Sequence, residues 1–375
     1  MPSLEADWLA LSLVEGVGQK AIRRLLDRFG SVGALLDASA DLIAEAAKLD
    51  PQLAARIARA REAESFATER RLIAHHGVQL LCLDQTDYPI ALRDIPVPPP
   101  LLYCRGEVPL PTGWFLAVVG TRQQSRYGEK VTRGLIEELA GLIPDLVIVS
   151  GLARGADTVA HRTALALGLK TVAVLAGGLT GIYPPENAGL AERIAEQGAL
   201  VTEFAMTMAP LAKHFPIRNR IISGLSRGVL VTEAGEKSGA LITAGFALNH
   251  GREVFAVPGA IDLPSTMGTH RLIQKGQAKL VTRAQDILEE FDFAAPRLPR
   301  QLDWLAPDPA AHKGAAAPYS ETQRKVLDCL QAEPMHANEL AQAVGMPVEK
   351  LLGVLLELEL SGEVCQTPDN RYAMA

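Results

Sequence analysis

The sequence predicts an α/β protein built around a doubly wound, mostly parallel sheet. From about residue 114 onward, short and wholly apolar runs alternate with stretches of helical periodicity; the runs are FLAVVG, LVIVSG, TVAVLAGG, ALVTEF, GVLVTEA and EVFAVPG. Strands that are apolar throughout belong to parallel sheets covered by helices on both faces. We therefore expect a Rossmann-like domain over residues 114–292, in a chain whose 375 residues suffice for two or three domains.

Residues 1–80 are predicted to form a helical domain, because apolar side chains recur there at helical spacing. The segment LVEGVGQKAIRRLL contains the Gly-hydrophobic-Gly turn with which a helix-hairpin-helix directs backbone amides at a phosphate, and Lys20 and Arg23 follow the turn. The same pattern also fits a tight turn between two helices followed by a solvated basic face. The two alternatives remain open at this stage.

Two Pro-rich segments separate the remaining parts of the chain. Residues 81–113 are predicted to be an extended linker that leads into an edge strand. Residues 293–317 are rich in Pro and Ala, have no apolar period, and are predicted to be a flexible linker. Residues 318–375 follow the order of three helices and a β-hairpin, which is typical of a winged helix-turn-helix domain.

Charge is distributed unevenly along the chain, whose net charge is −6. Residues 318–375 carry 4 Lys/Arg against 9 Asp/Glu, whereas residues 114–285 carry 18 against 13. Because the excess acid lies in the tail, the mildly basic central part can still present a phosphate-binding face. The overall negative charge therefore does not exclude a nucleic acid as the partner.

The chain shows no targeting or membrane signal. It starts without a basic region ahead of its first apolar stretch and has no uninterrupted apolar run of about 18 residues. Its four cysteines form no CxxC pair, so neither a zinc site nor a disulfide framework is indicated. We expect a cytoplasmic protein that does not enter a membrane.

Several predicted strand ends are Gly-rich turns that open helices. In doubly wound sheets ligands bind outside the carboxyl ends of the strands, where small residues and helix N-termini bring backbone amides close to an anion. The candidate binding residues in these turns are Gly120, Thr121, Arg122, Gly151, Arg154, Lys237, Ser238, Gly239 and Thr243.

A further candidate site lies in HFPIRNRIISGLS, residues 214–226. Arg218, Asn219 and Arg220 stand in a row ahead of an apolar, helix-capable run. Cations are normally unfavourable at a helix N-terminus, so the arrangement becomes useful only if an anion binds there. Phe215 in the same segment and Tyr183 after the third strand could provide stacking surfaces for bases; for Phe215, a role as a core anchor is the alternative.

Enzymatic signatures are missing from these turns. No G-x-x-x-x-G-K-[ST] is present, and no G-x-G-x-x-G follows the first strand, so neither a P-loop nor a nicotinamide site is supported. Asp157 and His161 could be an acid–base pair, but a helix-dipole partner and its helical neighbour explain them better. Glu203 and Glu233 close strands, and we expect them to orient the arginines of residues 214–226 through ion pairs.

Taken together, the motifs resemble those of the DprA/Smf family of DNA-processing proteins. They are GTR at 120–122, SGLARGADTVAH at 150–161, the PPEN of GIYPPEN, HFPIRNRIISGLS, SGALITA at 238–244 and VPG at 257–259, in this order. The resemblance covers the whole predicted Rossmann domain. The helical N-terminal part is similar to the family's SAM-like domain, and the tail is similar to its winged-helix module.

The resemblance implies a single-stranded DNA-binding protein of natural transformation. Members protect incoming strands, load the RecA recombinase onto them and form homodimers through the Rossmann domain, without catalysis, cofactor or metal. Carried over to this chain, Gly120, Thr121 and Arg122 match the phosphate-contacting turn, and Arg218, Asn219 and Arg220 the basic strand-binding segment. Ser238, Gly239 and Thr243 match the helix-mouth contacts. Secondary DNA contacts are expected at Lys20, Arg23, Lys213 and Thr269.

The chain departs from the family pattern at one position, and its tail is unusual. Gly-Thr-Asn is common in the family before the last Rossmann helix, whereas this chain has Gly268-Thr269-His270, which puts a contact from His270 in doubt. The predicted recognition helix in the tail, PVEKLLGVLLELELSGE, offers Lys350 against Glu349, Glu357, Glu359 and Glu363. Because a duplex-reading helix needs cations near the phosphates, we expect a regulatory or protein-binding module.

Two other functions remain as alternatives. The sheet also resembles the nucleotide phosphoribohydrolases of the lysine-decarboxylase-like family, although their Pro-Gly-Gly-x-Gly-Thr turn is replaced here by residues 233–239, EAGEKSG. Free base released from nucleoside monophosphates would support that enzyme. A winged-helix transcriptional regulator with a ligand-sensing Rossmann domain would instead leave sequence-specific duplex footprints, and its weak point is the acidic recognition helix.

Overall fold

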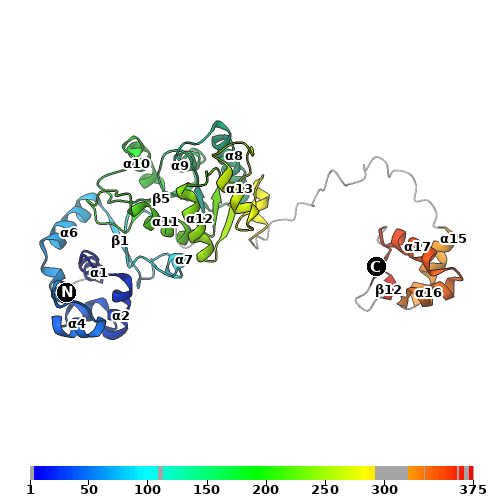
Figure 1. Ribbon diagram of the computed structural model, residues 1–375, viewed down its shortest axis with the longest axis horizontal. Coiled ribbons are helices and arrows are strands. Elements are labelled where there is room, and N and C mark those ends of the chain that lie inside the picture. Colours follow the sequence, from blue (N-terminus) through cyan, green and yellow to red (C-terminus); the bar gives the residue numbers. More distant parts are fainter. Residues whose placement is uncertain are drawn as a thin grey trace. The chain divides into compact units, whose positions relative to one another are not determined.

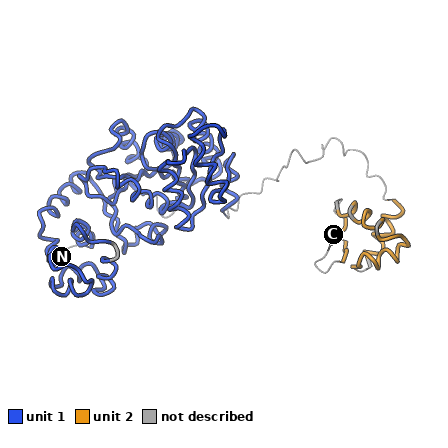
Figure 2. Tube along the Cα trace, in the orientation of Figure 1, with its two compact units in different colours: residues 1–293 blue, residues 294–375 orange. Residues whose placement is uncertain are grey.

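The computed structural model describes residues 4–108, 113–291, 320–332, 334–360, 363–366 and 371–374. The chain divides into two compact units, residues 1–293 and residues 294–375 (Figure 2). Within the ranges just given, no helix is long and apolar enough to cross a bilayer. The predicted linker over 293–317 lies outside the described residues.

The N-terminal part of the larger unit is helical. Its elements are α1 (Leu4–Ser12), α2 (Gln19–Phe29), α3 (Val32–Leu36), α4 (Ala40–Ala47), α5 (Pro51–Ala58), the 3-10 turn η1 (Ala60–Glu62) and α6 (Glu64–His76). The side chains of Ser31, Ser39 and Asp50 accept hydrogen bonds from the first amides of α3, α4 and α5, as good N-caps do. These helices gather at one end of the unit (Figure 1), where Trp8 is buried and donates to Asp84 at 2.8 Å.

A sheet of nine strands, counted in the described part of the chain, forms the centre of this unit. The strands are β1 (Gln79–Cys82), β2 (Leu101–Gly106), β3 (Trp114–Val119), β4 (Leu146–Ser150), β5 (Lys170–Val174), β6 (Ala199–Thr202), β7 (Gly228–Val231), β8 (Glu253–Ala256) and β9 (Lys279–Leu280). Their order is β1-β2-β6-β5-β4-β3-β7-β8-β9. All pairs from β6 to β9 are parallel, so the predicted mostly parallel α/β sheet is confirmed.

Helices cover both faces of this sheet. They are α7 (Ile90–Arg93), α8 (Arg126–Leu142), α9 (Ala156–Ala166), α10 (Ala188–Gln197) after the 3-10 turn η2 (Pro185–Asn187), α11 (His214–Leu225), α12 (Gly239–Asn249), α13 (Met267–Gln274) and α14 (Ala284–Leu288). In β3, Phe115 and Ala117 pack into the core shared with α11 and α12, whereas Leu116 and Val118 pack into the core of α8, α9 and α14. This alternation, with every residue of β3 buried, explains why the strand is apolar throughout.

Residues 81–113, for which the sequence predicts a linker and an edge strand, contribute more to the sheet than that. β1 forms the edge, and β2 lies between β1 and β6, antiparallel to both. Leu102 and Cys104 of β2 are buried in the same core as α11. The prolines that suggest a linker are concentrated between β1 and β2, in the segment IPVPPP at 95–100, where no ladder hydrogen bond is lost.

The strand order reverses at β3. The strands β4, β5 and β6 extend from β3 to one side, and β7, β8 and β9 extend to the other. The helix after β3, α8, and the helix after β7, α12, pack on opposite faces of the sheet. A crevice for a ligand is expected where neighbouring connections diverge in this way, at the carboxyl ends of β3 and β7.

The smaller unit is a winged-helix domain. It contains α15 (Glu321–Ala332), β10 (Met335–His336), α16 (Ala337–Val344), α17 (Val348–Leu360), β11 (Val364–Gln366) and β12 (Arg371–Met374). The hairpin strands β11 and β12 pair as the sequence predicts, and β10 adds a third strand beside β12. The unit has its own core, which includes Leu340, Leu351 and Leu355.

Candidate nucleic-acid interface

Two of the predicted phosphate turns lie in direct contact at the carboxyl edge of the sheet. The Arg122 turn follows β3 and the turn of residues 151–155 follows β4. The amide of Ala156 donates to the carbonyl of Thr121 at 3.2 Å, and a side chain at Gly155 would overlap the Thr121 and Arg122 backbone. Gly155 also has φ +72°, so only glycine fits at this position without strain.

An exposed cation and two aromatic rings meet beside these turns. The guanidinium carbon of Arg122 lies 5.2 Å from the ring centroid of Phe215, and the Phe215 ring lies 5.8 Å from that of Tyr183 in an edge-on arrangement. Arg122 and Tyr183 are exposed and Phe215 is half-buried. Within the described residues Arg122 has no acidic partner, so its charge is open to a ligand.

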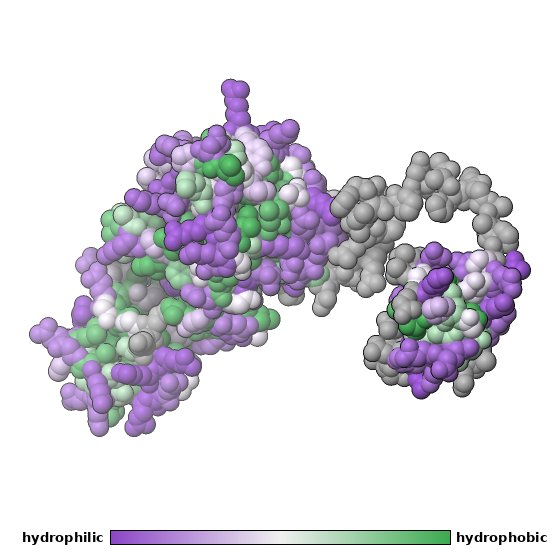
Figure 3. Space-filling model, turned by 45° about the vertical axis from the view of Figure 1, so that its right-hand side comes forward, coloured by the Kyte–Doolittle hydropathy of each residue, from purple (hydrophilic) through white to green (hydrophobic). Residues whose placement is uncertain are grey.

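Further apolar side chains are exposed in the segment before α11 and in the first turn of α11. Met208, Leu211 and Ile217 are each about as exposed as Tyr183. One face of the molecule appears in Figure 3, where hydrophilic side chains dominate the larger unit and hydrophobic patches interrupt them. Near Phe215, the edge of the sheet therefore combines the exposed guanidinium of Arg122 with apolar surface on which an aromatic ring of a ligand can stack.

Arg218 occupies a different position from the one that the sequence suggests. The helix α11 starts at His214, so Arg218 lies in its second turn and not ahead of it. Pro216 is compatible with that start because it falls in the first turn, where a helix amide has no intrahelical partner. The side chain is 4% exposed, and its Nη1 donates to the carbonyls of Gly151, at 2.8 Å, and Val174.

Asp157 is the buried counter-charge of Arg218. Its Oδ2 accepts from the amides of Gly151 and Ala153 at 3.1 and 3.2 Å, so Gly151 is held through both its N–H and its carbonyl. Burial raises the pKa of Asp157, and Arg218 and these amides oppose the rise. Burial also lowers the pKa of Arg218, to about 10, which leaves the guanidinium charged at neutral pH.

The other two residues of the basic segment are also engaged in the interior. Asn219 is 8% exposed and donates to the carbonyl of Gly239 at 3.3 Å, which connects α11 to the start of α12. Arg220 is 7% exposed and pairs with Glu203, as the sequence predicts for that carboxylate. In this structure Arg218, Asn219 and Arg220 therefore form hydrogen bonds and an ion pair with the turns that follow the strands. They present little surface to a ligand.

At the mouth of α12 the exposed residues are Glu236, Lys237 and Gly239. Ser238 is half-buried, and its hydroxyl accepts from the amide of Ala240 at 3.3 Å as the N-cap. Thr243 is buried at 2% exposure, because it lies on the side of α12 that faces α11 and the sheet. The accessible part of this turn is thus its backbone together with Glu236 and Lys237, and Lys237 forms no ion pair with any acidic residue that the structure describes.

The other residues predicted to contact DNA differ in exposure, and only some of them can reach a ligand. Lys213 is exposed at the N-cap of α11, close to the Phe215 cluster. Arg154 is exposed but paired with Glu186, and Gly151 is buried. Thr269 is fully buried and donates to the carbonyl of Thr266, which removes it from the surface. His270, where the family often has Asn, contacts the backbone of Gly259 through Nε2.

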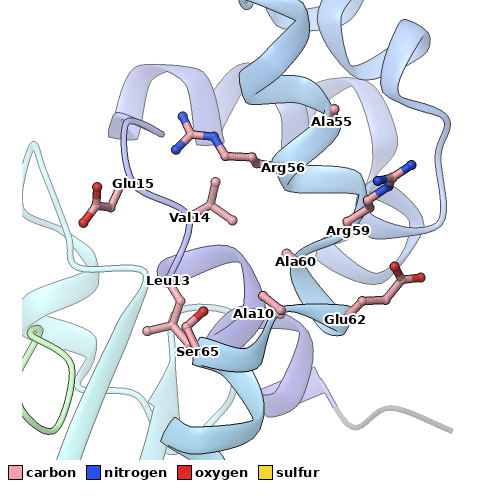
Figure 4. A pocket seen from close by; sticks show the side chains of 11 residues that line it. Ala10, Leu13, Val14, Glu15, Ala55, Arg56, Arg59, Ala60, Glu62 and Ser65 are labelled. Atoms are coloured by element: carbon pink, nitrogen blue, oxygen red, sulfur yellow. The ribbon is translucent and has the colours of Figure 1, made fainter.

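Lys20 and Arg23 lie far from this edge in sequence, in the first turns of α2. Arg23 is exposed, and Gly16 before the helix has φ +91°, so the tight turn is present. A pocket of about 600 Å³ lies beside this turn, with side chains from α1, α5, η1 and α6 around it (Figure 4). Its charged residues are Arg56, Arg59, Glu15 and Glu62. Because these charges balance, the pocket shows no preference for a phosphate.

The structure changes the prediction for Glu233 and gives no support to the disfavoured acid–base pair of Asp157 and His161. Glu233 does not pair with an arginine of α11; its Oε2 accepts from the amide and the hydroxyl of Ser125, both at 3.0 Å. The fully buried His161 contacts Thr171 at 2.8 Å and is not hydrogen-bonded to Asp157. Ser125, the N-cap of α8, is missing from the predicted site; Ser ahead of an apolar-periodic run was the available signal.

Comparison with known proteins identifies the family. The family model of DNA recombination-mediator protein A matches residues 79–292, and that of the DprA winged helix domain matches residues 308–370. The chain belongs to the DprA/Smf family. Protein Smf of Escherichia coli K12 is 43% identical over 297 residues, which cover 78% of this chain and 76% of that protein. The DNA processing protein DprA of Streptococcus pneumoniae is 47% identical over 206 residues, 55% of this chain and 72% of that protein.

Solved structures of the family agree with this assignment. The crystal structure of DprA from S. pneumoniae superimposes with a TM-score of 0.66 at 37% identity and covers 76% of this chain and 96% of that one. A structure of DprA from Helicobacter pylori, described for its single-stranded DNA binding mode, has a TM-score of 0.52 at 31% identity. It covers 58% of this chain and 96% of that one.

Proposed function

We propose that this protein binds single-stranded DNA at the carboxyl edge of its sheet. The observation that carries the proposal is the arrangement of Arg122, Phe215 and Tyr183. A single strand offers phosphates and unpaired bases, and a protein binds it best with a cationic groove beside aromatic surfaces. Here a guanidinium that forms no ion pair among the described residues lies over the ring of Phe215, which in turn contacts the ring of Tyr183.

The surrounding backbone supports the same ligand. The amides at the starts of α9 and α12 follow glycine-containing turns, and helix N-termini favour anions. Lys213 and Lys237 add exposed cations at neighbouring strand ends. The buried Arg218 adds positive charge beneath the surface, and it lies close enough to Arg122 for the two like charges to interact. The single-stranded DNA binding described for the H. pylori relative is consistent with this proposal.

We further propose the family's role in natural transformation: protection of incoming strands, loading of RecA and dimerisation through the Rossmann domain. We propose that no catalytic step is involved. Of the strand-end carboxylates that could have served as acids or bases, Glu233 is buried and accepts from Ser125, and Glu203, whose side chain is 14% exposed, pairs with Arg220. Release of free base from nucleoside monophosphates by the purified protein would contradict this part and support a phosphoribohydrolase.

Fluorescence anisotropy with matched single- and double-stranded oligonucleotides tests the binding proposal. We expect tighter binding of the single strand, and weaker binding for Arg122→Glu. For a single strand the logarithm of the affinity changes with the logarithm of the salt concentration by about 0.7 per phosphate contact, so the variant should show a correspondingly shallower slope. An affinity and a slope identical to those of the wild type would show that Arg122 is not part of the binding surface.

A further inference from the structure

The Arg122 turn is anchored at both of its ends to one buried residue, Glu233. On the near side, the amide of Thr121 donates to the backbone carbonyl of Glu233 at 2.7 Å. On the far side, the amide and hydroxyl of Ser125 donate to its carboxylate, both at 3.0 Å. Glu233 is 1% exposed and follows β7, the strand next to β3. The loop that carries Arg122 is therefore fastened to the neighbouring strand end.

Gly128 is the residue that makes room for this anchor. It lies in the first turn of α8, and its amide donates to the Ser125 hydroxyl at 3.0 Å. A Cβ atom at Gly128 would overlap Oε2 of Glu233, the oxygen that holds Ser125. By contrast, Gly134 in the same helix has no atom within 4 Å of such a Cβ. Within α8, the anchor thus requires glycine at position 128 and does not require it at position 134.

We propose that Glu233, through Ser125 and the space left by Gly128, is a positioning residue that holds Arg122 in its DNA-binding orientation. The inference rests on the proposed single-strand binding. Without the anchor, the four residues between Gly120 and Ser125 would lose the hydrogen bonds that fix Ser125 to Glu233, just after β7, and ordering the loop would then oppose binding. A second network on the same loop, from Gln124 to Thr132 and Thr232, leaves Arg122 itself unrestrained by side-chain hydrogen bonds.

The test compares Gly128→Ala with the matched control Gly134→Ala in the full-length protein. In an exposed helix interior, Gly to Ala stabilises the helix, so Gly134→Ala should bind single-stranded DNA like the wild type. Gly128→Ala should bind about tenfold more weakly, the equivalent of one charge-assisted contact, with a shallower salt dependence. A purely structural role of Gly128 would lower the melting temperature and leave the salt dependence unchanged.

A double-mutant cycle with Arg122→Ala connects the effect to Arg122. Gly128→Ala should weaken binding little further when Arg122 is already absent. If Gly128→Ala does not fold, Ser125→Ala and Glu233→Ala remove the anchor without adding volume, and Glu233→Gln, which keeps an acceptor oxygen, should restore binding. Wild-type affinity in Gly128→Ala, or losses that add to that of Arg122→Ala, would overturn the inference. If Arg122→Ala itself has no effect, the binding site proposed above is at fault instead.

Discussion

The guanidinium of Arg122 lies over the ring of Phe215, 5.2 Å from its centroid, although the two residues come from separate connections of the sheet. Arg122 follows β3 and Phe215 lies in the first turn of α11, which precedes β7. The contact therefore joins the turn after β3 to the start of the helix that follows β6, at the carboxyl edge of the sheet. A base that stacks on Phe215 would place its phosphate near Arg122.

Phe215→Leu should weaken binding of single-stranded DNA by about 1–3 kcal/mol, because one base loses its stacking surface. Phe215→Trp should bind at least as well as the wild type. Phe246→Leu serves as the control, because Phe246 is also half-buried and stacks on His250 but has no part in the proposed site. If Phe215 is instead a core anchor, Phe215→Leu will lower the melting temperature and leave the anisotropy titration unchanged.

Arg218→Ala should act mainly on stability, because it leaves the carboxylate of Asp157 buried without its counter-charge. It also removes the hydrogen bonds from the guanidinium to the carbonyls of Gly151 and Val174. Hydrogen bonds to charged groups contribute about 1.5–3 kcal/mol each, a loss that urea unfolding can measure. Arg154→Ala is the control: its pair with Glu186 is about half exposed, and solvent screens such pairs so that they contribute little to stability. The double variant Asp157→Asn, Arg218→Met should recover part of the loss. Wild-type stability combined with lost DNA binding would instead assign Arg218 to direct contact.

The sequence predicts the strands well and the orientation of the basic segment poorly. Wholly apolar runs such as LVIVS are found only where both faces of a strand are covered, so the sheet follows from composition alone. The burial of Arg218 depends on carbonyls 67 and 44 residues away, at Gly151 and Val174, which no local pattern indicates. The pair between Arg220 and Glu203 agrees with the expectation that carboxylates closing the strands, with no nucleophile beside them, orient the arginines of residues 214–226.

A protein shortened to residues 1–292 should bind duplex DNA no more weakly than the full-length chain. In the winged-helix unit, α17 exposes Glu357 and Glu359 together with Lys350, so acidic side chains would face the phosphates of a duplex. The unit has a core of its own, and the isolated fragment 318–375 is therefore a suitable second sample. Binding of duplex DNA by that fragment at low micromolar concentration in physiological salt would show that the unit does read duplexes.

His161 should make stability depend on pH through a buried, neutral imidazole. The Thr171 hydroxyl donates its one hydrogen to the carbonyl of Ile148, so Nδ1 of His161 must donate to that hydroxyl. The other nitrogen, Nε2, is buried without a hydrogen-bond partner. Burial, assisted by the charge of Arg218, lowers the pKa of His161 to about 3. Protonation of the folded state would bury both a charge and an unpaired N–H.

The sign of this pH dependence follows from the lowered pKa. Below pH 6.5 the unfolded chain binds a proton that the folded protein does not, so the free energy of unfolding should fall by up to about 1.4 kcal/mol per pH unit between pH 6.5 and 3. His161→Asn can keep the donor to Thr171 but cannot titrate. Urea unfolding of both proteins across this range isolates the contribution of His161, since Asp157 and Glu203, whose pKa values burial raises, titrate in both. Parallel stability curves would mean that His161 is protonated in the folded state.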